Sequence, residues 1–401
     1  MDSLLWISVT TVAKVLLVAC TGLLLGTQMA GGQQSVKGLG FYVVYVMLPC
    51  LLFTRLVDHL SWELLRTCYA AILFSNASMF IGYCCGQMTK RLVPPEAQGQ
   101  LVLACTFQNA VSFVLSLLSS LRGVPWLDAE AMEIAQAYVF VYNISCSLFL
   151  WGAGSVIVRD AVAKLKVLED AEEARQAGRV ALIEEVEKQT FFKKYVLPLS
   201  KNPPVMASAV ALVVGLTPLQ VLPAMQPLST IMSGVRTVGD GLVPLQLLVL
   251  GCQLISVDSV KATGPPASAE DAATDGAASP VPQGAESTSS VMGGKLSSFW
   301  GSLSTGKKIA VVAGCVRFGV IPGLLVTLLH YFVNWGLVPD NNVFKLVMII
   351  QLAAPCAVNI SILCTMYNYK PKRYTQIILS VYLASVVTTT GWISFALWYI
   401  G

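Results

Sequence analysis

The sequence predicts an all-α polytopic membrane protein with ten transmembrane helices. Hydrophobic residues make up 55% of the 401 positions and charged residues only 12%, which differs strongly from soluble domains. The charges also gather in short stretches between apolar runs of about 20 residues, the length that crosses about 30 Å of hydrocarbon. The net charge of +4 is small and dispersed, so no nucleic-acid partner is expected.

Ten apolar stretches have the required length, and each is predicted to be one span. The first contains Lys14, follows Asp2 and has no small-residue cleavage site, so it is expected to be a retained helix and not a signal peptide. The ten predicted spans are 4–26, 37–57, 68–88, 100–121, 134–157, 203–222, 229–256, 308–333, 343–366 and 375–399.

Basic residues predict the orientation of these spans, because Lys and Arg in short loops resist translocation. With the N-terminus outside the cytosol, 19 of the 26 basic residues fall in cytosolic connections. Both termini are therefore predicted to be non-cytosolic.

Two longer connectors divide the chain. Residues 159–194 mix charges of both signs with Ala, Leu and Val, which favours a solvated, partly amphipathic helix that connects two halves. Residues 258–293 have no aromatic, Leu or Ile, and we expect them to be disordered. The predicted organisation is listed in chain order: five helices over 1–158, a connector over 159–200, two helices over 201–257, a linker over 258–306 and three helices over 307–401.

The first connector separates five spans from five. An odd number of crossings per half inserts related halves in opposite orientations, the signature of an inverted-repeat transporter. Two correspondences between the halves support this hypothesis. Pro49 in span 2 matches Pro244 in span 7, and "FQNAVSFVL" in span 4 has the same position in the first half as "AAPCAVNISIL" in span 9 has in the second.

Spans 4 and 9 carry polar groups at mid-membrane, where they are expensive and informative. Span 4 has Gln108, Asn109 and Ser112; span 9 has Pro355 and Asn359. Pro355 removes a backbone donor, so a broken helix is expected there. Two broken, crossing helices would point their N-termini, each worth about half a positive charge, at a shared anion site.

The alternative interpretation is that these groups only bond a neighbouring helix. That interpretation is favoured for either span alone, but matching clusters in both halves favour a binding site. Asn76 in span 3 is a further residue that could face the same cavity.

Charged residues within spans have structural alternatives. Asp240 is the only carboxylate well inside a predicted span, and Arg236 precedes it by four residues on the same helix face. A structural Arg236–Asp240 pair is at least as well supported as a proton relay. Arg317 in span 8 could meet an anionic substrate, but snorkelling or pairing with Asp240 is favoured.

No sequence feature indicates an enzyme, a cofactor or a metal site. The 11 cysteines lie mostly in apolar runs without a Cys-x-x-Cys pair, and nucleotide-binding and hydrolase motifs are missing. Transport would therefore depend on gradients.

Several motifs are similar to those of the auxin efflux carrier superfamily, which includes the PIN and PIN-like carriers. The clearest are "KNPPVMASAVALVVGLTPLQ" at 201–220 and "GDGLVPLQLLVLGCQL" at 239–254; "MLPCLLFTRL", "FQNAVSFVL", "YVFVYNISCSLFLWGAG" and "APCAVNISILCTMYN" add to them. The connectors are closer to fungal and protist members. Ser112 and Phe113 stand where relatives commonly have a proline.

The resemblance implies the sodium/proton antiporter-like fold of two inverted five-helix repeats. Spans 1, 2, 6 and 7 would form a scaffold through which two copies associate, and spans 3–5 and 8–10 would move as an elevator. Substrate would bind where spans 4 and 9 cross, at Asn109 and Pro355.

We therefore expect a gradient-driven or uniporting carrier of a small organic anion, such as an aromatic monocarboxylate, in the endoplasmic reticulum. Two rivals remain: a proton- or sodium-coupled exchanger on the same fold, and a non-transporting regulator acting through its connectors.

Overall fold

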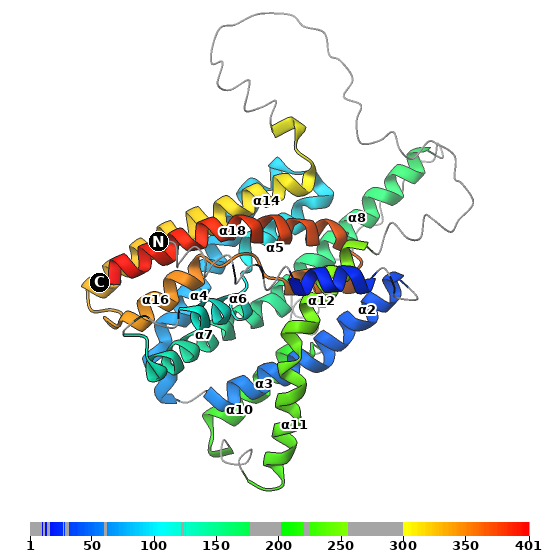
Figure 1. Ribbon diagram of the computed structural model, residues 1–401. Coiled ribbons are helices and arrows are strands. Elements are labelled where there is room, and N and C mark those ends of the chain that lie inside the picture. Colours follow the sequence, from blue (N-terminus) through cyan, green and yellow to red (C-terminus); the bar gives the residue numbers. More distant parts are fainter. Residues whose placement is uncertain are drawn as a thin grey trace, which may run out of the picture.

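The computed structural model describes residues 17–26, 32–59, 62–121, 126–176, 202–219, 225–255 and 300–400, together with positions 10, 13, 28 and 124. This part of the chain is all-helical (Figure 1). Within it, six helices are long and apolar enough to cross a membrane: Gln34–Asp58, Cys68–Leu92, Ala129–Val167, Leu228–Gln253, Thr305–Asn334 and Pro371–Ile400. The chain is therefore a polytopic membrane protein.

These six helices coincide with predicted spans 2, 3, 5, 7, 8 and 10. The other four predicted spans are either shorter helices or interrupted ones. Leu17–Gly26, in span 1, and Pro203–Leu216, in span 6, are shorter apolar helices. Spans 4 and 9 are interrupted near their middles. The ten-helix count thus stays a prediction.

One group of helices corresponds to predicted spans 2, 6 and 7. It packs around α2 (Gly32–Tyr42), the π-helical turn η1 (Val43–Met47) and α3 (Leu48–His59), which form one continuous rod. Three helices pack against this rod: α10 (Pro203–Leu216), α11 (Leu228–Asp240) and α12 (Leu242–Ile255). In Figure 1, α10 and α11 extend below the rest of the molecule beside α3. We call this the α3 group.

The helices of predicted spans 3–5 and 8–10 form a second group, called the crossing group because it contains both interrupted spans. Its first half has α4 (Trp62–Thr89), the short 3-10 turns η2 (Lys90–Leu92) and η3 (Pro95–Ala97), α5 (Gln98–Thr106), α6 (Ser112–Ser120), α7 (Ala129–Phe149), the π-helical turn η4 (Leu150–Gly154) and α8 (Ser155–Gln176). Its second half has α14 (Thr305–Cys315), the π-helical turn η7 (Val316–Val320), α15 (Ile321–Asn334), α16 (Asn342–Leu352), α17 (Asn359–Met366) and α18 (Pro371–Ile400).

Proline explains where several of these rods deviate from a regular helix. Pro49 follows η1, and Pro244 follows the end of α11 at Asp240, so the matched prolines both stand just after a helix irregularity. Pro322 follows η7 and leaves the Phe318 carbonyl without its helical donor. The Trp392 indole N–H of α18 donates to that carbonyl at 2.9 Å, so the irregular turn is satisfied by a neighbour.

The connector predictions are covered only in part. The helix of span 5 continues beyond the predicted end at 157, because α8 reaches Gln176, so the first part of the 159–194 connector is helical as expected. Its remainder, the predicted disordered stretch 258–293 and Lys14 lie outside the described residues.

Polar contacts fasten the starts of α5 and α18 together inside the crossing group. Gln100 donates to the Tyr369 carbonyl at 3.0 Å, and Arg373 Nε donates to Gln100 Oε1 at 2.6 Å. Tyr369 lies between α17 and α18, and its hydroxyl donates to the Glu96 carbonyl. Burial raises the pKa of Tyr369 to about 12, so this hydroxyl keeps its proton at neutral pH and stays a donor.

Gln253 connects the two groups. It is 1% exposed at the end of α12, donates to Thr365 Oγ1 of α17 at 2.7 Å and accepts from Thr375 Oγ1 of α18 at 2.8 Å. Any sliding of one group along the other must break these bonds.

Candidate functional site

The two interrupted spans cross as extended segments. Residues 107–111 separate α5 from α6, and residues 353–358 separate α16 from α17. The segments run antiparallel: the Asn109 N–H donates to the Pro355 carbonyl at 2.8 Å, and the Ala357 N–H donates to the Phe107 carbonyl at 3.0 Å. Each segment thus satisfies backbone groups that the other leaves open, as non-helical backbone inside a membrane requires.

The expected interruption is present in both spans, although only span 9 has a proline. In span 4, the Asn109 Oδ1 accepts from the Ser112 hydroxyl at 2.8 Å, at the first residue of α6. This local side-chain bond offers the chain an alternative to continuous helix. Span 4 therefore breaks without a proline in its interrupted segment.

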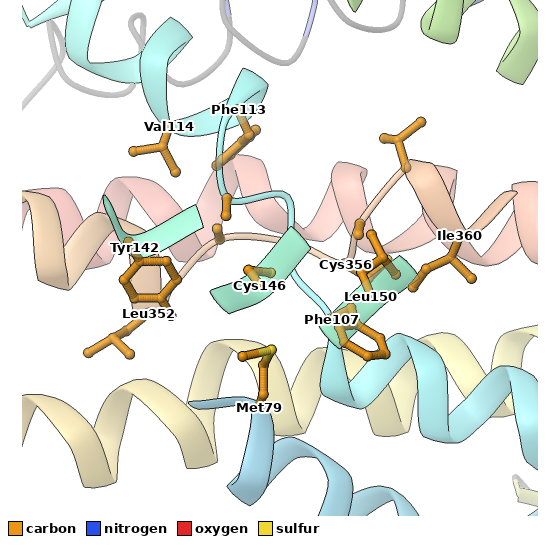
Figure 2. Close-up of a cluster of buried hydrophobic side chains, with 14 of the residues drawn as sticks. Met79, Phe107, Phe113, Val114, Tyr142, Cys146, Leu150, Leu352, Cys356 and Ile360 are labelled. Carbon is orange, nitrogen blue, oxygen red and sulfur yellow. The ribbon is translucent and has the colours of Figure 1, made fainter. Parts of the chain in front are cut away.

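Apolar side chains enclose the crossing. Phe107, Phe113 and Cys356 are each at most 1% exposed and belong to one large core cluster, together with Tyr142 of α7 (Figure 2). This shell covers one side of the crossing, so the polar groups that are buried there act in a low dielectric.

Arg317 lies buried behind the crossing, in the π-helical turn η7. It is 0% exposed, and its guanidinium donates to the Ala354 carbonyl at 3.2 Å, to Ser78 Oγ of α4 at 3.5 Å and, over a short contact, to Gln108 Oε1. All of these partners are neutral. Arg317 neither snorkels nor pairs with Asp240, so both favoured interpretations of this residue were wrong.

The side-chain amide of Gln108 belongs to a hydrogen-bond network inside the protein. Besides Arg317, its Oε1 accepts from Ser78, and its Nε2 donates to the Tyr142 hydroxyl at 2.6 Å and to Gln351 Oε1 at 3.5 Å. Gln351 in turn donates to the Ala110 carbonyl at 2.8 Å. The network ties both crossing segments to α4, α7 and η7.

Asn109 lies on the other side of the same backbone. Its amide nitrogen donates to the Tyr382 hydroxyl of α18 at 2.6 Å, and its side chain is partly exposed. Tyr382 is buried and in edge contact with Phe113. This contact fixes the orientation of the Asn109 amide.

A cavity of about 50 Å³ opens between the crossing and the α3 group. Its polar lining from the crossing comprises Gln108, Asn109, Ser112 and Asn359, while Leu48, Leu51 and Leu52 of α3 close the opposite wall. Ser112 and Asn359 are the first residues of α6 and α17, so two helix N-termini meet this cavity.

Further amides line this cavity that were not singled out from the sequence. Asn143 of α7 and Gln246 of α12 face it, and within the described part of the chain the Asn359 Oδ1 is buried without a hydrogen-bond partner. The criterion that selected Gln108, an amide deep in an apolar run, also fits Gln246 and Gln351. Gln246 stands two residues after Pro244 and Gln351 four residues before Pro355, so the sequence held a signal for both, but the direction in which each amide points depends on how the helices pack.

Pro355 and Asn76 lie nearby but outside the lining of this cavity. Pro355 contributes its carbonyl to the crossing, as described above. Asn76 lies on α4, where its Oδ1 is buried without a partner in the described residues.

Asp240 and Arg236 lie away from the crossing, in the α3 group. Asp240 pairs with Arg55 at 2.8 Å and Arg236 pairs with Asp58 at 2.7 Å, so two reciprocal salt bridges join α11 to α3. The expected Arg236–Asp240 pair does not form, because each side chain reaches across to the neighbouring helix.

The electrostatics of the cavity favour an anion. Two helix N-termini contribute partial positive charge, and Arg317 adds a full charge that no described carboxylate neutralises. The side-chain amides of Asn143, Gln246 and Asn359 line the same cavity, and each amide nitrogen is a hydrogen-bond donor. This arrangement can bind a small anion without any group that cleaves or forms covalent bonds.

The chain is an integral membrane protein with a polar cavity where two interrupted spans cross, and comparison with known proteins identifies its family. Residues 7–268 match the membrane transport protein family, so the chain belongs to this auxin efflux carrier family and is a transporter, not an enzyme. Similar curated proteins come from Arabidopsis thaliana. Protein PIN-LIKES 3 is 22% identical, covering 97% of this chain and 96% of that protein; PIN-LIKES 7 is 20% identical with the same coverage; PIN-LIKES 1 is 21% identical over 97% of this chain and 78% of that protein.

Proposed function

We propose that this protein carries a small organic anion, most simply an aromatic monocarboxylate such as an indole acid, through the membrane by uniport or along a gradient. The observation that carries the proposal is the uncompensated positive charge of Arg317 behind a polar cavity at mid-span. A carboxylate entering this cavity would gain electrostatic stabilisation that a neutral analogue would lack.

The cargo would bind at the amides. Asn109, Asn143 and Asn359 can donate to a carboxylate, and Ser112 and Gln246 complete the polar lining. A cavity of about 50 Å³ is far below the roughly 300–1,000 Å³ of ligand pockets, so loading requires the leucines of α3 to move away.

This movement would be an elevator motion of the crossing group along the α3 group. In this proposal ten helices form two inverted five-helix repeats, and spans 1, 2, 6 and 7 are the scaffold that dimerises. The matched irregularities at Pro49 and Pro244 and the paired crossings of spans 4 and 9 support the repeat.

We further propose that both termini face away from the cytosol and that the carrier works in the endoplasmic reticulum or another endomembrane. The distribution of Lys and Arg supports the orientation.

Flux in proteoliposomes tests this function. Wild-type protein is expected to transport radiolabelled indole-3-acetate, and replacing Asn109 with alanine should lower the rate, while indole-3-acetamide is carried poorly by both. Equal fluxes of acid and amide through wild type and variant would contradict the proposal.

A further inference from the structure

The side chain of Asn109 lines the cavity of about 50 Å³ at the crossing and has two chemically different ends. Its Nδ2 group has two N–H donors, whereas its Oδ1 atom only accepts hydrogen bonds. A carboxylate also only accepts, so it can bind the Nδ2 end and is repelled by the Oδ1 end. The orientation of this amide therefore determines whether Asn109 attracts an anion.

Two donors at the start of α6 hold the Oδ1 end of Asn109. The Ser112 hydroxyl donates to it at 2.8 Å, and the Phe113 backbone N–H donates to it at 3.5 Å. A hydroxyl can either donate or accept, but a backbone N–H can only donate. The Phe113 N–H therefore distinguishes the two ends of the amide and favours Oδ1 at this place.

Tyr382 of α18 holds the opposite end. Its hydroxyl oxygen accepts from Asn109 Nδ2 at 2.6 Å, which uses one of the two N–H groups and leaves the second for a ligand. Tyr382 is 1% exposed and is not among the described residues that line the cavity. It can therefore act on a cargo molecule only through Asn109.

Packing keeps the Tyr382 hydroxyl in place. Its ring is in edge contact with the ring of Phe113, with centroids 5.8 Å apart and an interplanar angle of 79°. Phe113 is itself buried, and its backbone N–H bonds the other end of Asn109. Contacts thus run in a closed ring from Asn109 to Tyr382, on to Phe113 and back to Asn109.

We propose that Tyr382 is a positioning residue that keeps the donor end of Asn109 available to the cargo and so makes the cavity selective for carboxylates over carboxamides. A carboxamide has both N–H donors and an oxygen acceptor, so it can bind either end of the Asn109 amide. Removing the Tyr382 hydroxyl frees this amide to turn, which weakens binding of the acid alone. The cargo class rests on the proposed function; the positioning role rests on these contacts.

Equilibrium binding of an acid and its amide tests this role. Full-length protein in nanodiscs of phosphatidylcholine is titrated with radiolabelled indole-3-acetate and, separately, with indole-3-acetamide. Tyr382→Phe should weaken binding of the acid about threefold to tenfold, the effect of one neutral hydrogen bond, and should leave binding of the amide within about twofold. The phenylalanine retains the ring against Phe113, so a purely structural defect would instead weaken both ligands alike.

A double variant shows whether Tyr382 acts through Asn109. In Asn109→Ala the positioned group is missing, so adding Tyr382→Phe should weaken acid binding no further. Tyr399→Phe is the matched control, because it removes the same hydroxyl from the same helix about 25 Å away, where Tyr399 contacts His330. It should change binding of neither ligand.

Unchanged acid binding in Tyr382→Phe, together with a loss in Asn109→Ala, would overturn the positioning role and leave the proposed function intact. Equal losses of acid and amide binding in Tyr382→Phe would also overturn this role, as would a further loss of acid binding in the double variant. If wild type shows no saturable binding of the acid, the proposed function and the positioning role are both refuted.

Discussion

Arg317 of the crossing group and the two arginines of the α3 group, Arg55 and Arg236, have opposite kinds of partner. In the α3 group, Arg55 and Arg236 each face an aspartate across the α3–α11 contact, with side chains 35% and 45% exposed. In the crossing group, Arg317 is fully buried, and its partners are carbonyl, amide and hydroxyl oxygens.

Under the proposed function, this difference would separate structural charges, Arg55 and Arg236, from a charge that serves the cargo, Arg317. Partly exposed pairs are electrically neutral and worth only about 0–1 kcal/mol each. A buried cation without a counter-ion costs stability, and proteins keep such groups where a function needs them. We infer that the crossing keeps its positive charge for the cargo.

The largest expected effect follows from removing this charge. Arg317→Gln should lower indole-3-acetate flux about 100-fold or more, the size expected when a buried charge loses its partner at a cost of 3–5 kcal/mol. Arg317→Lys should keep a measurable part of the flux. Normal flux through Arg317→Gln would show that transport does not need the charge of Arg317.

Removing the amide at the crossing should have the next largest effect. Asn109→Ala deletes a donor to a carboxylate, worth about 1.5–3 kcal/mol, so flux should fall about 10- to 100-fold. Asn334→Ala is the matched control, since this amide lies at the end of α15 and bonds His330. A similar loss of flux in both variants would indicate that the substitutions impair folding rather than binding of the cargo.

Contacts between the two groups should affect the rate of movement more than binding. Gln253→Leu removes the bonds to Thr365 and Thr375 and should change flux several-fold, about the effect of one or two neutral hydrogen bonds. Indole-3-acetate affinity at equilibrium should stay nearly constant. A parallel loss of affinity would place Gln253 in the binding site instead.

The smallest effect is expected in the paired charges. Asp240→Asn should leave flux within about twofold and cost about 1 kcal/mol of stability or less, because the Arg55–Asp240 pair is half exposed. Flux as a function of pH should keep its wild-type shape. Lost proton or sodium dependence in this variant would favour the coupled exchanger.

Sequence reasoning reached the polar residues of spans 4 and 9 because amides in apolar runs are costly and stand out locally. It placed the break at Pro355 from covalent geometry alone. The partners of charged side chains on neighbouring helices could not be predicted from the sequence. Asp240 and Arg236 have the spacing of an ion pair within one helix, yet each pairs with a residue of α3, because the partner depends on how the helices pack. The contacts of Arg317 were not predicted for the same reason, because its partners come from α4 and from both crossing segments.

The most direct test of the account compares an anion with its neutral isostere. Binding of indole-3-acetate and indole-3-acetamide is measured on wild type and on Arg317→Gln, both as full-length protein in nanodiscs of phosphatidylcholine. Wild type should strongly prefer the acid, and Arg317→Gln should lose most of this preference. An unchanged preference in Arg317→Gln would contradict the claim that the buried charge behind the crossing selects the cargo.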